Sequence, residues 1–189
     1  MLDNLEKYKV ILASGSPRRR ELMVGLGVNY EVRILPDVDE SYPDTLQGEE
    51  IPLYIAKEKA DAYIPMMQPD ELIITADTIV WLDGEVLGKP RDREDALQML
   101  RTMSGRTHEV FITTTDWQRS FTAQTEVRFA TLSEDEIIYY VDNFKPMDKA
   151  GAYGVQEWIG FIGVENISGS YYNIMGLPVQ KLYRELLKV

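Results

Sequence analysis

The apolar residues of this chain switch repeatedly between two spacings, and that alternation constrains the fold more than any other feature of the sequence. Short apolar runs typical of buried strands are followed by segments whose apolar residues recur every three or four positions, as in a helix packed on one face. The opening and middle of the chain alternate strand with helix, whereas 107–132 reads as a long antiparallel hairpin. We therefore expect an α/β fold built on a mixed sheet with flanking helices.

The same periodicity predicts the individual elements. The expected strands are 8–13, 29–35, 71–76 and 79–82, with the hairpin 107–132; the expected helices are 17–26, 52–64, 92–103, 133–143 and about 178–188. A polar loop up to about residue 50 and a glycine-rich region over 145–170 complete the chain.

A length of 189 residues suits one hydrophobic core better than two, so residues 1–189 are expected to form a single domain. The apolar runs are shorter than the roughly 18 residues that a membrane span needs. The opening residues, MLDNLEKYKV, carry acids where a signal peptide carries basic groups. We expect a cytoplasmic protein that does not bind membranes.

Composition excludes several kinds of chemistry. The sequence has no cysteine, which excludes disulfides, thiolate nucleophiles and cysteine-bound zinc. His108 is the single histidine, and at a strand start it is more typical of a surface or hydrogen-bonded residue than of a catalyst. The formal net charge of -11 argues against a broad nucleic-acid surface. An enzyme of this composition must rely on carboxylates, lysines, arginines or a bound metal.

Three consecutive arginines begin the first predicted helix, in the stretch SGSPRRREL. Ser16 and Pro17 read as an N-cap followed by the first helical residue, which places Arg18, Arg19 and Arg20 in the first turn. The helix dipole disfavours positive charge there, by roughly 0.3–1 kcal/mol for each exposed cation. A local preference broken three times in succession is expected at functional sites.

A helical wheel separates the three arginines. Arg19 falls in the middle of the apolar stripe that includes Leu22, Arg18 lies at its edge and Arg20 faces away. An inward guanidinium needs an anion, and the N–H groups of the first turn beside the small residue Ser14 suit a phosphate. The alternative is that Arg19 pairs with an internal acid while the other two are solvated. This segment alone leaves both interpretations open.

A second segment, TADTIVWLDGEVLGKPRD (75–92), places polar groups after an apolar run. Asp77 and Thr78 follow the strand LIIT, at the end where ligands bind in α/β sheets, and Lys89 arrives in a Gly-Lys-Pro corner. A carboxylate and an ammonium group near each other could serve as base or metal ligand and as phosphate clamp. Taken in isolation, a hairpin with Asp77 capping a turn and Lys89 in solvent is the plainer explanation.

Two glycine-containing segments give weaker signals. In FKPMDKAGAYGVQ (144–156), small residues around Lys149 permit close backbone approach, and Gln156 could read a base edge through its amide. A plain turn would look much the same. The segment ISGSYYNIMGLPV (167–179) resembles a tight entry into the final helix, with anion binding as a further interpretation.

The helix predicted over 52–64 carries two candidate lysines. Its buried face is expected to include Leu53 and Ala56, and both Lys57 and Lys59 lie at the margins of that face. The helical wheel does not choose between them.

Taken together, four motifs resemble the Maf family of septum-formation proteins, which are nucleoside triphosphate pyrophosphatases. The motifs are SGSPRRREL, ADT followed twelve residues later by GKP, DKAGAYGVQ and GSYYNIMGLPV, in the family's order and spacing. The resemblance implies a two-lobed α/β architecture with an elongated mixed sheet, like that of inosine triphosphate pyrophosphatases. It also implies hydrolysis of a nucleoside triphosphate to monophosphate and pyrophosphate with a divalent cation, Mg²⁺ or Mn²⁺.

The resemblance assigns roles to residues that match the family's motifs. The implied proton acceptor is Asp77, the implied metal-holding residues are Glu40 and Asp77, the implied phosphate-binding residues are Ser14, Arg19, Lys59 and Lys89, and the residues implied to set base specificity are Arg18, Thr78 and Gln156.

Two positions bear on the substrate. A branch of the family acting on 7-methylguanosine triphosphate has a bulky aromatic residue directly after the Ser-Pro pair, where this sequence has Arg18. The chain therefore resembles the branch that hydrolyses dTTP and UTP, with modified pyrimidine nucleotides as further candidates. After Gln156, Glu157 and Trp158 replace the small residues expected there, which leaves the shape of the base pocket open.

Two other functional classes compete with the enzyme. A non-catalytic nucleotide-binding regulator of cell division would need the phosphate clamp but neither Asp77 nor a metal. A nucleic-acid-binding protein conflicts with the net charge. The partner expected is the small-molecule nucleotide, and a homodimer stays an open alternative.

Overall fold

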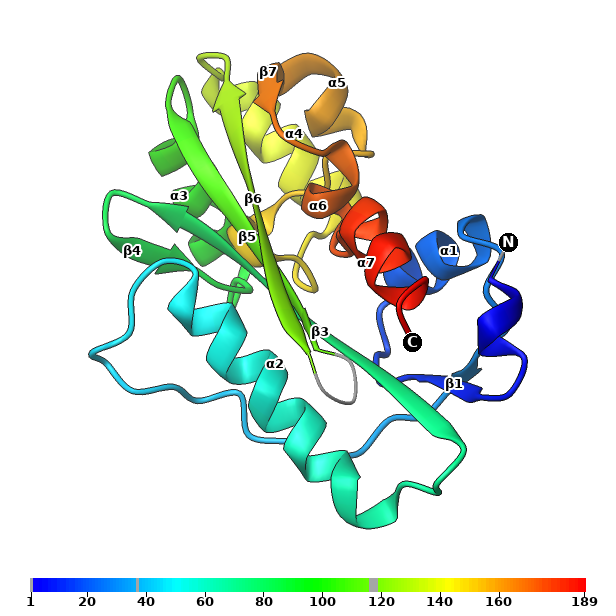
Figure 1. The fold of residues 1–189 in the computed structure, drawn as a ribbon. Helices are drawn as coiled ribbons and strands as arrows, with labels where there is room; N and C mark the ends of the chain where they lie inside the picture. The colour runs from blue at the N-terminus through cyan, green and yellow to red at the C-terminus, as the bar shows by residue number, and fades with distance from the viewer. Residues whose placement is uncertain (1, 37, 116–118) are drawn as a thin grey trace. The chain divides into compact units, whose positions relative to one another are not determined.

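The computed structural model describes residues 2–36, 38–115 and 119–189 (Figure 1). The described chain forms two compact units. Unit 1 comprises Met1–Asp77, Ile112–Ala123 and Gly176–Val189, and unit 2 comprises Thr78–Phe111 and Gln124–Met175. Three of the four boundaries fall inside strands, so β3 (Glu71–Leu82), β5 (Thr107–Thr115) and β6 (Ser120–Phe129) contribute residues to both units.

Unit 1 contains the N-terminal elements and the last helix. Its complete elements are the 3-10 helices η1 (Asp3–Leu5) and η2 (Ile64–Met66), strands β1 (Lys9–Leu12) and β2 (Glu31–Val32), and helices α1 (Pro17–Gly25), α2 (Glu50–Tyr63) and α7 (Val179–Leu186). The side-chain amide of Asn4 donates to the Leu186 carbonyl at 2.7 Å. This bond ties the start of the chain to α7.

Parallel strands form the centre of unit 1. Strand β1 pairs in parallel with β2 and β3, and the register sets Leu12 opposite Val32 and Ile74. Ile11, Leu12 and Ile74 are fully buried, as expected where both faces of a parallel sheet are covered. The Ala13 N–H donates to the Ile74 carbonyl at 2.9 Å. The segments that follow Leu12 and Ile74 therefore begin side by side, at the carboxyl end of the parallel strands.

Helix α2 runs beside the first part of β3 in unit 1 (Figure 1). The Thr75 hydroxyl donates to the Ala56 carbonyl at 2.8 Å, and Tyr63 packs with Ile73 of β3. The prediction that Leu53 is buried is wrong, since its exposed fraction is 38%. The buried face of the helix is centred farther round its axis, and it consists of Ile51, Pro52, Ile55, Ala56, Ala60 and Tyr63.

Within the described residues, unit 2 is built from antiparallel strands, four α-helices and one 3-10 helix. Its complete elements are β4 (Glu85–Leu87), α3 (Arg93–Met103), α4 (Glu134–Phe144), η3 (Ala150–Ala152), α5 (Trp158–Gly163), β7 (Val164–Ser168) and α6 (Tyr171–Met175). Antiparallel pairs among the described residues include β3 with β4 and β6 with β7. Asp83 and Gly84 turn β3 into β4 with φ values of 52° and 88°, as a two-residue hairpin turn requires.

Helices α3 and α4 start at strong caps and are joined by an ion pair. Asp92 caps α3, while Ser133 and Glu136 form a capping box at the start of α4. Arg101 on α3 pairs with Glu134 on α4. These local signals explain why the two predicted helices match the structure to within one residue at each end.

Within the described residues, seven strands form a hydrogen-bonded sheet in the order β2-β1-β3-β5-β6-β7, with β4 paired to β3. Parallel and antiparallel pairs both occur, so the predicted α/β fold with a mixed sheet and flanking helices is confirmed. No helix in these ranges combines the length and apolarity that crossing a membrane would need.

Four predicted segments differ from the structure. The strand expected over 29–35 is reduced to Glu31–Val32, and the strands expected over 71–76 and 79–82 form the single strand β3. The glycine-rich region 145–170 contains α5 and β7. Strands β5 and β6 are neighbours, as the predicted hairpin requires. Residues 116–118, which the prediction also includes, lie outside the described residues.

The ion pair between Arg33 and Glu71 in unit 1 predicts how the stability of the protein changes in acid. Both Nη atoms of Arg33 donate to the buried Glu71 carboxylate, and this pairing lowers the pKa of Glu71 to about 2. Because the folded pKa lies below the ordinary value of 4.5, the pair stabilises the fold above that value and loses its contribution as pH falls towards about 2. Glu71→Gln should lower the free energy of unfolding near neutral pH and flatten its decline in acid, as measured by urea unfolding.

The exposed Glu58 of α2 supplies the control. Glu58→Gln should leave both the free energy of unfolding and its acid dependence close to those of the parent protein. An acid profile of Glu71→Gln as steep as that of the parent would contradict the assignment.

Candidate active site

Helix α1 begins as the sequence predicts. Ser16 is the N-cap, its hydroxyl accepts from the Arg19 N–H at 3.5 Å, and Pro17 is the first helical residue. Leu22 and Met23 form the buried side of the helix. The three arginines therefore lie in the first turn of a capped helix that directly follows the small residues after β1.

Arg19 points into unit 1. Its Nε donates to the Gly176 carbonyl at 2.7 Å and its Nη1 donates to the Ser14 hydroxyl at 3.2 Å. Burial lowers the pKa of Arg19 below its ordinary value, and the negative charges of Asp77 and Glu40 oppose that shift. The inward position predicted for Arg19 is confirmed, and the charges of Asp77 and Glu40 act on its guanidinium group. Binding of a phosphate by Arg19 stays a prediction.

The two neighbouring arginines are also partly buried. Arg18 lies close enough to Arg19 for its charge to lower the pKa of that group further. The Nε of Arg20 is buried and has no hydrogen-bond partner among the described residues. Arg20 is therefore less solvated than the wheel alone indicates.

Lys59 joins two carboxylates. Its Nζ lies 2.8 Å from Asp77 Oδ1 and 2.8 Å from Glu40 Oε1. The Lys59 side chain is 14% exposed, whereas Lys57 on the same helix is exposed. The structure thus settles the choice that the helical wheel left open, because Lys59 shares the side of α2 that faces β3.

Asp77 lies inside a strand, so its interpretation as a strand-end residue is wrong. Strand β3 leaves its parallel pairing with β1 after Ile74 and begins its antiparallel pairing with β4 at Val80. Asp77 falls between these two stretches and is 9% exposed. It still lies beyond the carboxyl end of the parallel pairing, where ligands bind in α/β sheets.

Unit 2 brings two of the recognised motifs together. Lys89 is exposed in its Gly-Lys-Pro corner, and the carbonyl of the preceding Gly88 accepts from the Gly151 N–H at 3.0 Å. Gly151 has a φ of 67°, and a Cβ there would lie 3.0 Å from the Val80 side chain. The DKAGAYG segment therefore needs its glycine to pack beside β3 and the corner that carries Lys89.

Lys149 is a buried cation that the predicted site residues did not include. Its Nζ lies 2.7 Å from Asp148 Oδ1 and 3.1 Å from Glu157 Oε1, and its side chain is 9% exposed. The small residues that surround it in the sequence were the available signal, since they permit close packing around a long side chain. Gln156, next to Glu157, is partly buried.

The predicted residues fall into two groups. Unit 1 holds Ser14, Arg18, Arg19, Glu40, Lys59 and Asp77, and unit 2 holds Thr78, Lys89 and Gln156. Within unit 1 the hydrogen bonds, ion pairs and charge interactions connect every member of the first group. The expected action of both groups on one substrate stays a prediction.

His108 is a structural residue of unit 2. It is 1% exposed, its Nε2 lies 2.8 Å from the Tyr153 hydroxyl, and its ring packs edge-on against Phe129. Burial lowers the pKa of His108 to about 4. The ring is therefore neutral at physiological pH, in agreement with the predicted hydrogen-bonded role.

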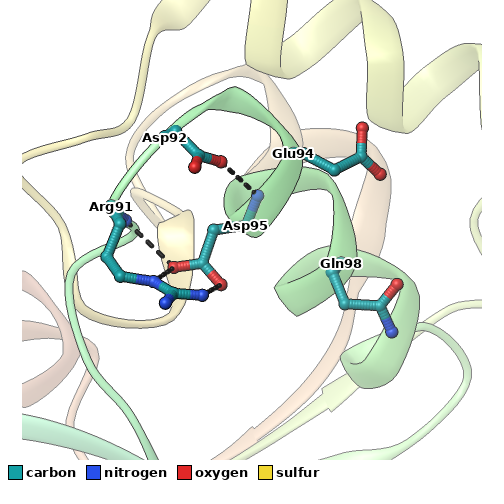
Figure 2. Close-up of a pocket in the computed structure, with 5 residues that line it drawn as sticks. All are labelled: Arg91, Asp92, Glu94, Asp95 and Gln98. Atoms are coloured by element: carbon teal, nitrogen blue, oxygen red, sulfur yellow. Dashed lines mark hydrogen bonds and ion pairs between the residues drawn. The ribbon is translucent and has the colours of Figure 1, made fainter.

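A surface pocket of about 320 Å³ lies at the start of α3 (Figure 2). Figure 2 shows Asp92 capping the helix at the Asp95 N–H and Arg91 paired with the Asp95 carboxylate. Glu94 and Gln98 complete its lining. Acidic groups at a helix N-terminus interact favourably with the helix dipole, which explains why acidic residues line this pocket. None of the predicted site residues lines it.

The two carboxylates beside Lys59 have the chemistry of ligands for a divalent cation. Glu40 and Asp77 come from different segments and already bracket one positive charge, the Lys59 ammonium. Among the described residues, no cluster of three or more His, Asp or Glu side chains is arranged to hold a metal by itself. Two carboxylates suit Mg²⁺ in particular, since it commonly takes one or two carboxylates and completes its shell with water and substrate phosphates.

Residues 9–189 match the protein family described as Maf-like protein. The chain belongs to the Maf family. Its relatives include the dTTP/UTP pyrophosphatase of Bacteroides thetaiotaomicron, 69% identical with the whole of both chains covered, and that of Bacteroides fragilis, 68% identical with 98% of both covered. The dTTP/UTP pyrophosphatase of Porphyromonas gingivalis is 53% identical over 98% of this chain and 96% of its own.

A solved structure supports the fold. The HAM1 protein of Coxiella burnetii matches with a TM-score of 0.52 at 14% sequence identity, covering 96% of this chain and all of that protein. At this identity the likeness concerns the fold alone. It agrees with the mixed α/β architecture that the resemblance to inosine triphosphate pyrophosphatases implies.

Proposed function

We propose that this chain hydrolyses dTTP and UTP to the nucleoside monophosphate and pyrophosphate. The observation that carries the proposal is the cluster formed by Arg19, Lys59, Asp77 and Glu40. These residues match the family's motifs, and this chain is similar over its whole length to a dTTP/UTP pyrophosphatase. Modified pyrimidine nucleotides are further candidate substrates.

Arg19, Lys59 and Lys89 are assigned to the phosphates. A triphosphate carries about four negative charges, and an acidic chain can hold it only where cations are gathered. The Arg19 fork is already oriented by Ser14 and Gly176, so little side-chain entropy is lost when phosphate binds. Lys59 has three N–H donors, and those directed at Glu40 and Asp77 can be shared with phosphate oxygens.

Glu40 and Asp77 would hold the divalent cation. In the cluster, the charges of Arg19 and Lys59 are balanced by these two carboxylates, which leaves the triphosphate charge to be compensated. When bound, Mg²⁺ or Mn²⁺ would offset that charge and polarise the phosphoryl group.

Asp77 is assigned as the proton acceptor. One of its carboxylate oxygens accepts from Lys59 at 2.8 Å, which orients the group in a nearly buried position. Water attacks the α-phosphorus and gives up a proton to Asp77 while the bond between the α-phosphorus and the bridging oxygen breaks. The products are the monophosphate and pyrophosphate, and the protein forms no covalent bond.

Arg18, Thr78 and Gln156 are assigned to recognition of the base. Arg18 occupies the first turn of α1 and Thr78 follows Asp77 in β3. A glutamine amide offers a donor and an acceptor side by side, which suits the donor and acceptor pattern of a uracil or thymine edge.

The proposal is tested by incubating the purified protein with a panel of nucleoside triphosphates and Mg²⁺ or Mn²⁺. We expect pyrophosphate and the monophosphate from dTTP and UTP, with much slower release from purine triphosphates. Chelation by EDTA should abolish turnover, and restoring Mg²⁺ should recover it. Orthophosphate as the primary product would place cleavage at the γ position and contradict the proposal.

A further inference from the structure

The turn that carries Gln156 is closed at both ends. The Glu157 N–H donates to the Gly154 carbonyl at 2.9 Å, so 154–157 form a hydrogen-bonded turn with Gln156 as its third residue. Gln156 Oε1 is buried and has no hydrogen-bond donor among the described residues. A buried acceptor without a donor costs free energy in the absence of a ligand, which suggests that a ligand supplies one.

One hydroxyl group holds the two ends of this turn. Tyr140 on α4 is fully buried; its Oη accepts from the Gly154 N–H at 3.0 Å and donates to Glu157 Oε2. Burial, helped by the Glu157 hydrogen bond, raises the pKa of Tyr140 far above its ordinary value. The hydroxyl therefore stays protonated and can keep both bonds at any working pH.

Lys149 supports the same carboxylate from its other oxygen. Its ammonium lies 3.1 Å from Glu157 Oε1, and the Glu157 side chain is 22% exposed. A carboxylate with a hydrogen bond on one oxygen and an ion pair on the other has little freedom to rotate. Glu157, the residue that departs from the small residues expected after Gln156, is therefore fixed from two sides.

Steric contacts keep the turn in place from the remaining sides. A Cβ at Gly160 of α5 would lie 1.8 Å from the Val155 carbonyl oxygen, and a Cβ at Gly154 would lie 2.8 Å from the Glu157 side chain. Helix α5 thus packs directly on the backbone of the turn. Movement of the backbone of the turn would require both α5 and the Glu157 side chain to shift.

We propose that Tyr140, Lys149 and Glu157 form a positioning network that fixes the Gln156 amide for recognition of a uracil or thymine base. Both bases present an N3–H donor beside a carbonyl acceptor, which matches Oε1 as acceptor and Nε2 as donor. Cytosine presents an acceptor at N3 and would face Oε1 with a lone pair. The inference rests on the proposed function, and it assigns base selectivity to residues that do not themselves touch the base.

The test compares binding of UMP and CMP, measured by calorimetry, in four proteins. Tyr140→Phe removes the hydroxyl that joins the ends of the turn, and Glu157→Ala removes the carboxylate. Both variants should weaken UMP binding and reduce the preference for UMP over CMP by about tenfold. Binding of inorganic triphosphate should be unchanged in both, because the phosphate residues are untouched.

Tyr153→Phe is the matched control. It also removes a buried tyrosine hydroxyl of unit 2, the partner of His108, and should lower the thermal unfolding temperature while keeping the ratio of UMP to CMP affinity. A parent-like ratio in both Tyr140→Phe and Glu157→Ala would overturn the inference, as would equal affinity for UMP and CMP in the parent protein. If Tyr140→Phe fails to fold, Glu157→Ala decides alone, since it replaces a partly exposed side chain.

The two proposals can fail separately. A parent protein that binds UMP selectively, loses that selectivity in the variants and releases no pyrophosphate would contradict the proposed function and support the positioning network. Release of pyrophosphate from UTP together with parent-like selectivity in both variants would do the reverse.

Discussion

Asp77→Asn is expected to lower kcat/KM for dTTP and UTP by about 10³-fold, the largest single effect that the site predicts. Asparagine keeps the shape and can still accept from Lys59 but cannot take a proton from water. In the absence of a divalent cation, nucleotide affinity should be equal or tighter, because a negative charge beside the phosphates is removed. Pyrophosphate release under steady-state conditions, with nucleotide binding measured separately, checks both expectations.

A conservative change on α2 provides the comparison for this variant. Asp61 is an exposed aspartate in the same unit, and Asp61→Asn should retain parent-like kcat and KM. Full turnover by Asp77→Asn with intact nucleotide binding would remove the proton acceptor from the proposed mechanism. A large increase in KM at constant kcat would instead show that Asp77 serves binding rather than chemistry.

Lys59→Met is expected to lower kcat/KM by about 10²-fold, because one preorganised cation is removed from the phosphate site. Methionine keeps most of the apolar stem of the lysine side chain. Without the ammonium group, the negative charges of Glu40 and Asp77 act on each other and on the triphosphate. Because the two carboxylates then lack a neighbouring positive charge, the variant should bind Mg²⁺ more tightly and need a lower Mg²⁺ concentration for half-maximal rate. Titration of Mg²⁺ at fixed UTP measures this requirement.

Lys57→Met is the matched control, since Lys57 is two residues away on the same helix and exposed. Its kcat/KM and Mg²⁺ dependence should equal those of the parent protein. Equal losses of kcat/KM in Lys57→Met and Lys59→Met would indicate a general electrostatic effect of lowering positive charge. That result would contradict a specific role for Lys59.

The local features of the site could be predicted from the sequence because each depends on neighbours within a few residues. Ser16 and Pro17 specify the start of α1, and the spacing of Leu22 and Met23 fixes which side is buried. These two facts together turn Arg19 inward, as the structure confirms. Capping signals likewise set the limits of α3 and α4.

The choice of Lys59 over Lys57 could not be made from the helix alone. A side chain at the margin of the buried face of α2 points inward or outward depending on where β3 lies. The hydrogen bond from the Thr75 hydroxyl to the Ala56 carbonyl fixes β3 beside the helix. The sequence predicts two strands, with Asp77 after the first, because polar residues separate the two apolar runs. In the structure the two runs form one strand, whose pairing partner changes from β1 to β4. The open choice between the lysines and the wrong placement of Asp77 both concern pairing between distant segments.

The sequence by itself determined the mixed α/β class, the capped helix that carries the arginines and, through its motifs, membership of the Maf family. Tertiary structure alone decided which lysine meets Asp77 and Glu40, and why Glu157 is tolerated beside Gln156. The physical reason is the same in both cases. Helical periodicity and capping are short-range, whereas an ion pair or a buried hydroxyl between distant residues exists only after the chain has packed.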